Sequence, residues 1–292
     1  MPSSRDSING GFFRYPAGEM TVTALHDGIL RRPLEGLLRN ASVDDSRAAL
    51  AESGLPTDAL TVTFTPILIE HKGILILIDT GHGDLGGETN GFMLENMKAA
   101  GHAPDSIDHV IVSHFHPDHI NGLRSADGTE IFPSATIHVP RTEWNFWTKE
   151  VRDMENQPDA IKATAANVSR VFSPIADKIT FFNDGEEILP GITARAAQGH
   201  TPGHTAFELS SGNRKLLVMS DICNHPALFV RHPEWSPIFD MLPELALTTR
   251  AHFLNLVAEQ NMQVSFFHAP FPATGYIEKA QKGFRFIPLA TV

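Results

Sequence analysis

The sequence is poor in cysteine, tyrosine and long hydrophobic runs. Cys223 is the single cysteine among 292 residues, which excludes an intramolecular disulfide framework and a cysteine-based zinc cluster. Apolar runs such as residues 73–78 are far shorter than the ~18–20 residues that a membrane span needs. Lys and Arg number 23 against 34 Asp and Glu, a formal net charge of −11, and no run of basic residues is present. We therefore expect no nucleic-acid partner and no membrane partner.

The composition nevertheless supports a folded chain, because 42% of its residues are hydrophobic. Residues 1–19 are polar and Gly-rich, and we expect an N-terminal lead-in there. No Pro/Ser/Gly-rich linker divides the rest, so residues 20–292 are predicted to form a single domain. The first residues lack the apolar core of a signal peptide. We expect a cytoplasmic protein, or a periplasmic one if an export signal was removed before the numbered chain.

Hydrophobic periodicity predicts strands in both halves of the chain, with helices between and after them. The run at residues 73–79 is apolar at consecutive positions, which is typical of a strand buried on both faces. The predicted strands are residues 20–26, 62–70, 73–79, 108–113, 135–139, 178–182, 192–197, 204–210, 215–220 and 263–267. The predicted helices are residues 43–53, 92–100, 142–151, 159–171 and 243–260. This pattern favours a mixed α/β domain with two sheets and covering helices.

Histidine is the residue in excess, with 15 in the chain. The segment His114-Phe115-His116-Pro117-Asp118-His119 directly follows a predicted buried strand and places four metal-capable side chains within six residues. In a tight turn, His114 and His116 can converge on one ion while Asp118 and His119 point to another. A His-rich surface loop is the alternative explanation, and the spacing at a strand end argues against it.

Three further signals also stand where predicted strands end. They are His200 in a Gly- and Pro-rich loop, Asp221 after the apolar run at residues 216–219, and His268. Taken singly, each has an ordinary structural explanation: a turn, a helix cap or a buried structural histidine. Together with residues 114–119 they supply imidazole and carboxylate ligands without thiolate, a set that suits two divalent ions with a bridging oxygen. His225, close to Asp221, is the histidine most able to join them, and the others are expected to be surface or structural.

These segments resemble the metallo-β-lactamase superfamily. The resemblance also includes Asp79, in the strand-end sequence Ile78-Asp79-Thr80-Gly81. It implies an α/β (α+β) fold, the αββα sandwich, with two mixed β-sheets flanked by helices and the metals at one edge. It also implies a set of site residues: His114, His116 and His200 for the first metal, Asp118, His119 and His268 for the second, Asp221 bridging both, and Asp79 and His204 supporting the ligands without binding metal.

Within the superfamily, residues 116–123 and 268–276 look most like the branch of methyl-parathion hydrolase, which includes hydrolases of aryl esters and of aromatic lactones such as dihydrocoumarin. Acyl-homoserine lactonases usually carry a Tyr shortly after the bridging Asp, whereas this chain has Cys223-Asn224-His225 there. Flavo-diiron oxygen reductases carry Glu where His116 stands. Cys223 is expected to be a buried small hydrophobe and not a ligand.

The resemblance implies hydrolysis of small apolar esters or lactones by attack of a metal-bridging hydroxide, with Asp118 and Asp221 acting in catalysis as metal ligands. Two ions ~3.5–4 Å apart can lower the pKa of such a water to ~7. No Gly-x-Ser-x-Gly nucleophile motif is present, so we expect no covalent intermediate. We expect Zn, with Mn, Co or Fe as alternatives.

Other functions remain open. They are a phosphotriester (organophosphate) hydrolase with the same site, an acyl-homoserine lactonase, a mononuclear-iron persulfide dioxygenase and a non-catalytic metal-binding protein. Metal analysis separates the iron enzyme from a site with two zinc-like ions.

The substrate pocket has four aromatic candidates. Trp144 and Trp147 are three residues apart on a predicted helix and hence on one face. They could pack into the core or form an aromatic wall for an apolar substrate near the metals. Phe92 and Phe271 are similar candidates. We expect a small-molecule substrate, and a homodimer is the assembly we consider.

Overall fold

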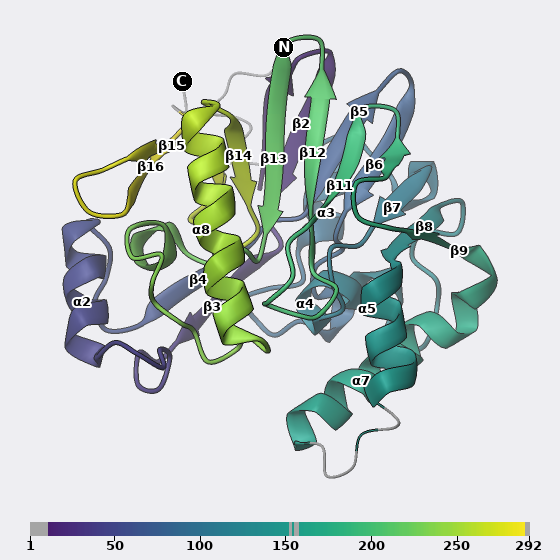
Figure 1. Cartoon of the computed structure of the whole chain (residues 1–292). Coiled ribbons are helices and arrows are strands. Elements are labelled where there is room, and N and C mark those ends of the chain that lie inside the picture. The colour runs from purple at the N-terminus through teal and green to yellow at the C-terminus, as the bar shows by residue number, and fades with distance from the viewer. Residues whose placement is uncertain (1–10, 152–153, 155–157, 290–292) are drawn as a thin grey trace.

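The computed structural model describes residues 11–151, 154 and 158–289 (Figure 1). Its first sheet has the strand order β1-β2-β5-β6-β7-β8-β9, its second β10-β11-β12-β13-β14-β15-β16, and β3 pairs with β4. The first sheet consists of β1 (Phe12–Ala17), β2 (Met20–Leu25), β5 (Ile67–His71), β6 (Ile74–Ile78), β7 (His109–Ile111), β8 (Thr136–Pro140) and β9 (Ile179–Phe182). The second consists of β10 (Glu187–Leu189), β11 (Ile192–Ala196), β12 (Thr205–Ser211), β13 (Arg214–Ser220), β14 (Gln263–Phe266), β15 (Thr274–Lys279) and β16 (Phe284–Pro288).

Helices and short helical turns connect these strands. The α-helices are α2 (Val43–Glu52), α3 (Met93–Ala99), α4 (Pro117–Ile120), α5 (Arg141–Asn145), α7 (Asp159–Phe172) and α8 (Pro243–Glu259). The shorter turns are η1 (Gly83–Leu85), η2 (Pro104–Ser106), η3 (Asn121–Leu123), η4 (Phe146–Glu150), η5 (Ser173–Lys178) and η6 (Pro226–Val230), and the two-stranded sheet consists of β3 (Gly28–Arg32) and β4 (Leu60–Phe64).

Both large sheets mix strand directions. In the first, β1, β2, β5 and β6 are antiparallel neighbours, whereas β6, β7, β8 and β9 run parallel. In the second, β13 and β14 are parallel and the other neighbours are antiparallel. The prediction of two mixed sheets flanked by helices is confirmed.

The apolar runs explain why two sheets stack face to face. Along β6, Ile76 and Ile78 pack between the sheets, while Leu77 faces the outer helices, because successive side chains point to opposite faces. Along β13, Leu216 lies between the sheets and Leu217 lies under α8. A strand that must bury both faces therefore needs an apolar residue at every position.

Helices cover the outer faces, completing the αββα sandwich (Figure 1). Helix α3 and helix α7 pack on the first sheet through residues that include Met97 and Phe172. Helix α8 packs on the second sheet through Leu254 and Val257. Among the described residues, no helix is long and apolar enough to cross a membrane.

The structure corrects two predicted boundaries. Residues 12–17, which we placed in the lead-in, form β1 and pair with β2. The predicted strand at residues 62–70 is two strands, β4 and β5, which belong to different sheets. Pro66 lies at the break, and its missing backbone N–H is a signal that our reading of the hydrophobic pattern did not use.

Candidate metal centre

The candidate site is built from loops that follow strands of both sheets. Residues 114–119 follow β7, His200 lies between β11 and β12, Asp221 directly follows β13, and His268 lies two residues after β14. Because β6, β7 and β8 are parallel, their carboxyl ends lie at one edge of the first sheet. The parallel pair β13 and β14 brings Asp221 and His268 together in the same way.

Two non-glycine residues at this edge have left-handed backbones. Asp79 has φ 58° and Ser220, next to Asp221, has φ 45°. Such conformations cost about 1–3 kcal/mol each and cluster at functional sites. Each occurs at a strand end, where the chain turns sharply to present a carboxylate.

All seven predicted ligands come together. Three groups have their ligand atoms within 4.8 Å of one another: His114, His116 and His200; His114, His119 and Asp221; and Asp118, His119 and His268. The first and third groups match the two sets that the resemblance implies, and Asp221 lies between them.

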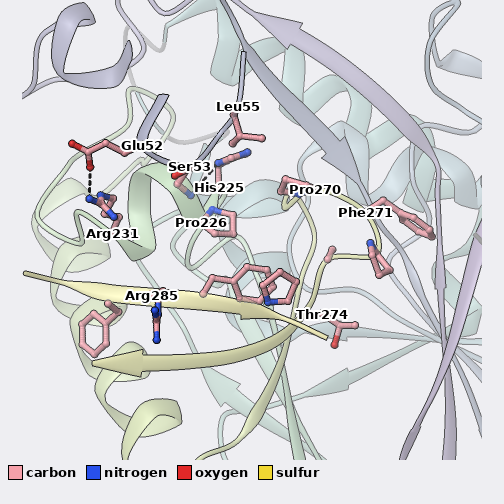
Figure 2. A pocket seen from close by; sticks show the side chains of 16 residues that line it. Glu52, Ser53, Leu55, His225, Pro226, Arg231, Pro270, Phe271, Thr274 and Arg285 are labelled. Carbon is pink, nitrogen blue, oxygen red and sulfur yellow. Dashed lines mark hydrogen bonds and ion pairs between the residues drawn. The ribbon is translucent and has the colours of Figure 1, made fainter. Parts of the chain in front are cut away.

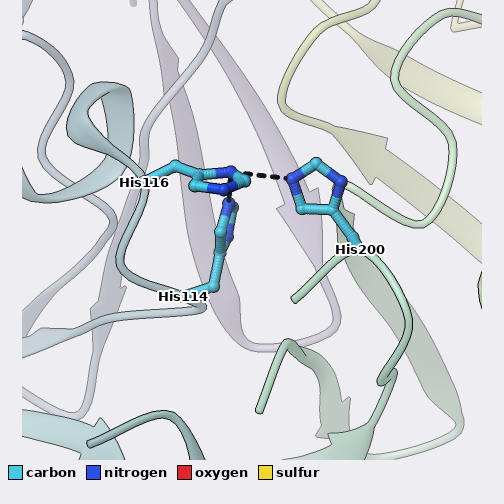
Figure 3. A group of neighbouring side chains, drawn as sticks. All are labelled: His114, His116 and His200. Carbon is cyan, nitrogen blue, oxygen red and sulfur yellow. Dashed lines mark hydrogen bonds between the residues drawn. The ribbon is translucent and has the colours of Figure 1, made fainter. Parts of the chain in front are cut away.

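The first group is the tightest. His116 Nδ1 lies 3.0 Å from His114 Nε2 and 2.9 Å from His200 Nε2, and the three rings point toward one another (Figure 3). A nitrogen that faces two others can satisfy at most one of them with a proton. A shared cation satisfies all three lone pairs at once.

The outward nitrogens of the histidines fix their tautomers. His119 Nδ1 lies 2.8 Å from Asp79 Oδ2, His200 Nδ1 lies 3.0 Å from Asp240 Oδ1, and His268 Nδ1 lies 3.0 Å from the Thr63 carbonyl oxygen. Each acceptor keeps the proton on Nδ1, which leaves the Nε2 lone pair facing the centre. This is the usual arrangement around a metal-binding histidine.

Asp221 lies at the middle of the site. Its Oδ2 is 3.1 Å from His268 Nε2 and 3.2 Å from His200 Nε2, whereas its Oδ1 faces His119 Nε2 at 3.4 Å. Both Asp221 Oδ1 and His119 Nε2 are buried without a hydrogen bond. Buried polar atoms without a partner are rare, so this pair fits a site that holds a cation.

The electrostatics of the site also favour added positive charge. Burial raises the pKa of the Asp221 carboxyl, but His268, His119 and His200 outweigh burial and hold the pKa well below its usual value. Burial lowers the pKa of His116 to about 3, and also lowers that of His114. Burial also lowers the pKa of His119 and His200, but the carboxylates around them outweigh burial and raise it above the usual value. The site therefore gathers ionised carboxylates around imidazoles that a divalent ion would bind in the neutral form.

Asp79 and His204 support the ligands and do not face the centre. Asp79 Oδ1 accepts a hydrogen bond from the Ser113 backbone N–H at 2.8 Å, and Oδ2 accepts one from the Ser113 hydroxyl. His204 Nδ1 lies 2.8 Å from the Ala197 carbonyl oxygen, and its Nε2 accepts the Asp221 backbone N–H at 3.1 Å. His204 therefore fixes the backbone from which Asp221 projects.

Glu143 joins the two loops that carry the first group. Its carboxylate accepts hydrogen bonds from the Phe115 N–H at 3.0 Å, the Trp147 indole at 2.7 Å, the Thr201 hydroxyl at 2.8 Å and the Gly203 N–H at 2.8 Å. Burial raises the pKa of this fully buried carboxyl, and the four donors oppose that rise. Glu143 lies in the predicted helix at residues 142–151. Its neighbours in the sequence give no sign that it joins these two loops.

Asp240 and Arg250 form a buried ion pair behind His200. Arg250 lies 3.1 Å from Asp240 Oδ2, and it also donates to the carbonyl oxygens of Ile222 and Trp235. Sequence reasoning missed this pair because neither residue belongs to a recognisable motif. The only local signal is an acidic residue shortly before a long predicted helix.

A second histidine–carboxylate pair lies near the other end of the site. His82 Nδ1 lies 3.1 Å from the buried Asp27, and its ring contacts Phe64, which in turn contacts the ring of His268. We expected His82 to be a surface or structural residue. Its position after the Asp79-Thr80-Gly81 turn is the signal that could have placed it beside the site.

The four aromatic candidates for the substrate pocket lie in different parts of the structure. Trp147 is buried in the core, and both tryptophans line a cavity of about 630 Å³ between η4 and α7, which none of the predicted ligands lines. The suggested aromatic wall beside the metals is therefore not supported, because these rings pack against helix α7. Phe92 is exposed at the start of α3, and Phe271 contacts His26 and lines a cavity of about 440 Å³ that has no predicted ligand in its walls (Figure 2).

Cys223 is buried beside the site without joining it. Burial raises the pKa of its thiol to about 12, and it belongs to none of the three ligand groups. It packs in the apolar cluster under α8.

The family model of the metallo-β-lactamase superfamily matches residues 65–256. The chain belongs to the metallo-β-lactamase superfamily. As a member it is a metal-dependent hydrolase with the sandwich fold and a metal-binding edge. The narrower likeness to the methyl-parathion hydrolase and dihydrocoumarin hydrolase branch is not established by this match.

Solved structures extend the comparison. AidC, described as a dizinc quorum-quenching lactonase in complex with a product N-hexanoyl-L-homoserine, is 27% identical, with a TM-score of 0.90 over 96% of this chain and 98% of that one. A hydrolase named AbOPH in the β-lactamase superfamily is 26% identical, with a TM-score of 0.90 over the same shares. A probable metal-dependent hydrolase from Staphylococcus aureus is 20% identical, with a TM-score of 0.78 over 95% of this chain and 100% of that one, and shows the shared fold.

Proposed function

We propose that the chain hydrolyses small apolar esters and lactones, of the aryl ester and aromatic lactone type, with two divalent ions. The observation that carries this proposal is the convergence of five histidines and two aspartates at one sheet edge. In our proposal His114, His116 and His200 hold one ion, Asp118, His119 and His268 hold the other, and Asp221 contacts both. Zinc is the metal we propose, supported by the dizinc relative and by the five imidazoles among these ligands, since imidazole suits zinc.

When bound, two divalent ions supply an activated water and polarise the oxygen of the attacked group. The residues of this chain position that chemistry. Asp79 and Asp240 hold the histidine Nδ1 protons, so the lone pairs stay aimed at the centre. His204 holds the Asp221 backbone, and Glu143 keeps the two loops of the first group at a fixed separation. A phenolate or enolate leaving group needs little protonation, so these substrates do not require a dedicated acid.

N-acyl-homoserine lactones are a second candidate substrate class. The similarity to AidC over 96% of this chain favours them. The absence of a Tyr shortly after Asp221 argues against close functional equivalence with the acyl-homoserine lactonases that carry it. Phosphotriesters are a third class, because they can be attacked by the same activated water.

A metal assay combined with a substrate screen tests the proposal. Purified protein is analysed for metals by mass spectrometry and then assayed with dihydrocoumarin, an N-acyl-homoserine lactone and a phosphotriester side by side. We expect two zinc-like ions per chain and the highest kcat/KM with dihydrocoumarin. One iron per chain without lactone hydrolysis would contradict the proposal. His252→Ala, at an exposed position of α8, serves as a histidine control that keeps the ligand set intact.

A further inference from the structure

The turn that contains His82 is fixed to helix α4, which carries two of the proposed ligands. The Thr80 backbone N–H and the Thr80 hydroxyl both donate to the His119 carbonyl oxygen at 2.9 Å. The Gly81 carbonyl oxygen accepts the Gly122 N–H at 3.1 Å. These bonds hold His82 at a fixed position beside the proposed ligands.

A buried carboxylate orients the His82 ring. Asp27 is 0% exposed, and its Oδ2 accepts the His82 backbone N–H at 2.9 Å and lies 3.1 Å from His82 Nδ1. Its Oδ1 accepts the Met93 N–H at 2.9 Å. Gly81 has φ 67°, and a Cβ there would lie 2.5 Å from the Asp27 carboxyl carbon, so the turn closes tightly on this carboxylate. The carboxylate keeps a proton on Nδ1, and Nε2 is the free nitrogen of the ring.

The free nitrogen, His82 Nε2, is open to solvent. It has no hydrogen-bond partner among the described residues, and it is not one of their buried polar atoms without a partner. The His82 side chain is 18% exposed, similar to the 21% of Asp118. Among the proposed ligands only Asp118 and His116 are partly exposed, whereas the other five are buried. A substrate must therefore approach the centre from the side of His116 and Asp118.

His82 lies within electrostatic reach of Asp118 on this open side. Burial raises the pKa of the Asp118 carboxyl, but neighbouring histidines outweigh burial and hold the pKa below its usual value. His82 is one of these histidines, together with His119 and His268. The Phe64 ring contacts the rings of both His82 and His268, with centroids 4.3 and 5.4 Å apart. An imidazole that a carboxylate orients and that substrate can reach is typical of a general acid or base.

We propose that His82, oriented by Asp27, is a catalytic residue that protonates the leaving oxygen of the substrate from Nε2. The proposal rests on the proposed hydrolase function and extends its substrates to alkyl esters and alkyl lactones, whose alkoxide leaving groups need a proton. When the C–O bond breaks, its electron pair goes to the leaving oxygen, and the Nε2 proton converts that oxygen into an alcohol. The attacking water releases a proton to solvent when it becomes hydroxide, and a solvent proton returns to Nε2, so the cycle balances.

Two lactones of equal ring size test the proposal. δ-Valerolactone releases an alkoxide, whereas dihydrocoumarin releases a phenolate, which needs little protonation. A general acid contributes about 10²–10⁴-fold to a rate that depends on proton transfer. We therefore expect His82→Gln to lower kcat for δ-valerolactone about 100-fold or more, and kcat for dihydrocoumarin less than about threefold. An equal loss with both lactones would overturn the proposal, because it would show that His82 only supports the local structure.

His102→Gln is the matched control, because His102 belongs to another histidine–carboxylate pair. Its Nε2 lies 3.5 Å from Glu70, and its side chain is 13% exposed. Glu70 is paired with Leu75 near the start of β6, whereas the metal centre lies beyond the end of that strand. We expect this variant to leave the ratio of the two kcat values unchanged. A ratio that changes as much as in His82→Gln would overturn the assignment to His82.

Two measurements test the role of His82 without an activity assay. Metal analysis of His82→Gln should find the same ions per chain as in the wild type, because His82 is not one of the proposed ligands. Long-range proton–nitrogen NMR spectra of the wild type and of His82→Gln identify the His82 ring by difference. We expect its neutral form to carry the proton on Nδ1. A neutral ring with its proton on Nε2, or loss of an ion from the variant, would overturn the proposal.

The same lactone assay separates failure of this proposal from failure of the hydrolase function. If the wild type hydrolyses neither lactone nor any other ester, the proposed function fails, and the role of His82 fails with it. If the wild type hydrolyses both lactones and His82→Gln slows both equally, the hydrolase function stands and only the role of His82 is wrong.

Discussion

Replacing Glu143 with glutamine is expected to destabilise the fold and loosen the candidate metal centre together. Glu143 is fully buried and accepts four hydrogen bonds. Two come from Phe115 and Trp147, and two come from the loop around His200. Glutamine has nearly the same shape, but one of its terminal atoms is an NH₂ group, which donates and cannot accept. One pair of donors must therefore face another donor.

The expected magnitude follows from which pair loses its acceptor. If the amide nitrogen faces Thr201 and Gly203, the hydroxyl can turn to accept, and the Gly203 N–H is left unpaired. If it faces Phe115 and Trp147, two N–H donors are left unpaired. A buried donor without a partner costs about 1–3 kcal/mol, so we expect a loss of about 2–4 kcal/mol in the free energy of unfolding.

Urea unfolding at neutral pH measures this loss, and chelator competition measures metal affinity in the same preparations. We expect metal affinity to fall about tenfold or more, because supporting partners of metal ligands have effects of that size. Glu259→Gln is the control. Glu259 pairs with Lys279 and both side chains are exposed, so its loss should cost about 0–1 kcal/mol. A change below about 0.5 kcal/mol in Glu143→Gln would refute the reasoning.

Three further predictions concern Asp240, His138 and Cys223. Asp240→Asn should weaken metal binding about 10–100-fold by chelator competition, because His200 loses its anionic partner; unchanged affinity would contradict this. Burial lowers the pKa of His138 from 6.5 to about 4, so its contribution to stability is complete above pH 6.5 and is lost as pH falls toward 4. Urea unfolding across that pH range should show a smaller loss of unfolding free energy in His138→Gln than in the wild type. An equal loss would show that another group titrates. Cys223→Ala should keep the full metal content, and the wild-type thiol should react with a thiol reagent only after unfolding.

Most of the architecture is predictable from the chain because apolar periodicity depends on local sequence. The runs at β6 and β13 are apolar at consecutive positions, and both prove to be buried on two faces. The break between β4 and β5 and the pairing of β1 were not predictable in this way, since they depend on which sheet each segment joins.

The candidate site shows the same division. His114 to His119 are close in sequence, so their convergence needs only a tight turn. Glu143, Asp240 and Asp27 act through contacts with segments at least 28 residues away. No spacing rule links residues so far apart, and only the packed structure shows which carboxylate faces which histidine. Trp147 illustrates the opposite error. The sequence suggested a substrate-pocket residue, whereas its indole donates a hydrogen bond to Glu143 in the core.

The most direct test of the central claim is a paired measurement on Asp221→Ala and the wild type. Asp221 lies between the two proposed ligand groups, with one oxygen toward His119 and the other toward His200 and His268. We expect the wild type to contain two ions per chain and to hydrolyse a lactone, and the variant to lose turnover and bind both ions weakly. Wild-type turnover with intact metal content in Asp221→Ala would contradict the account.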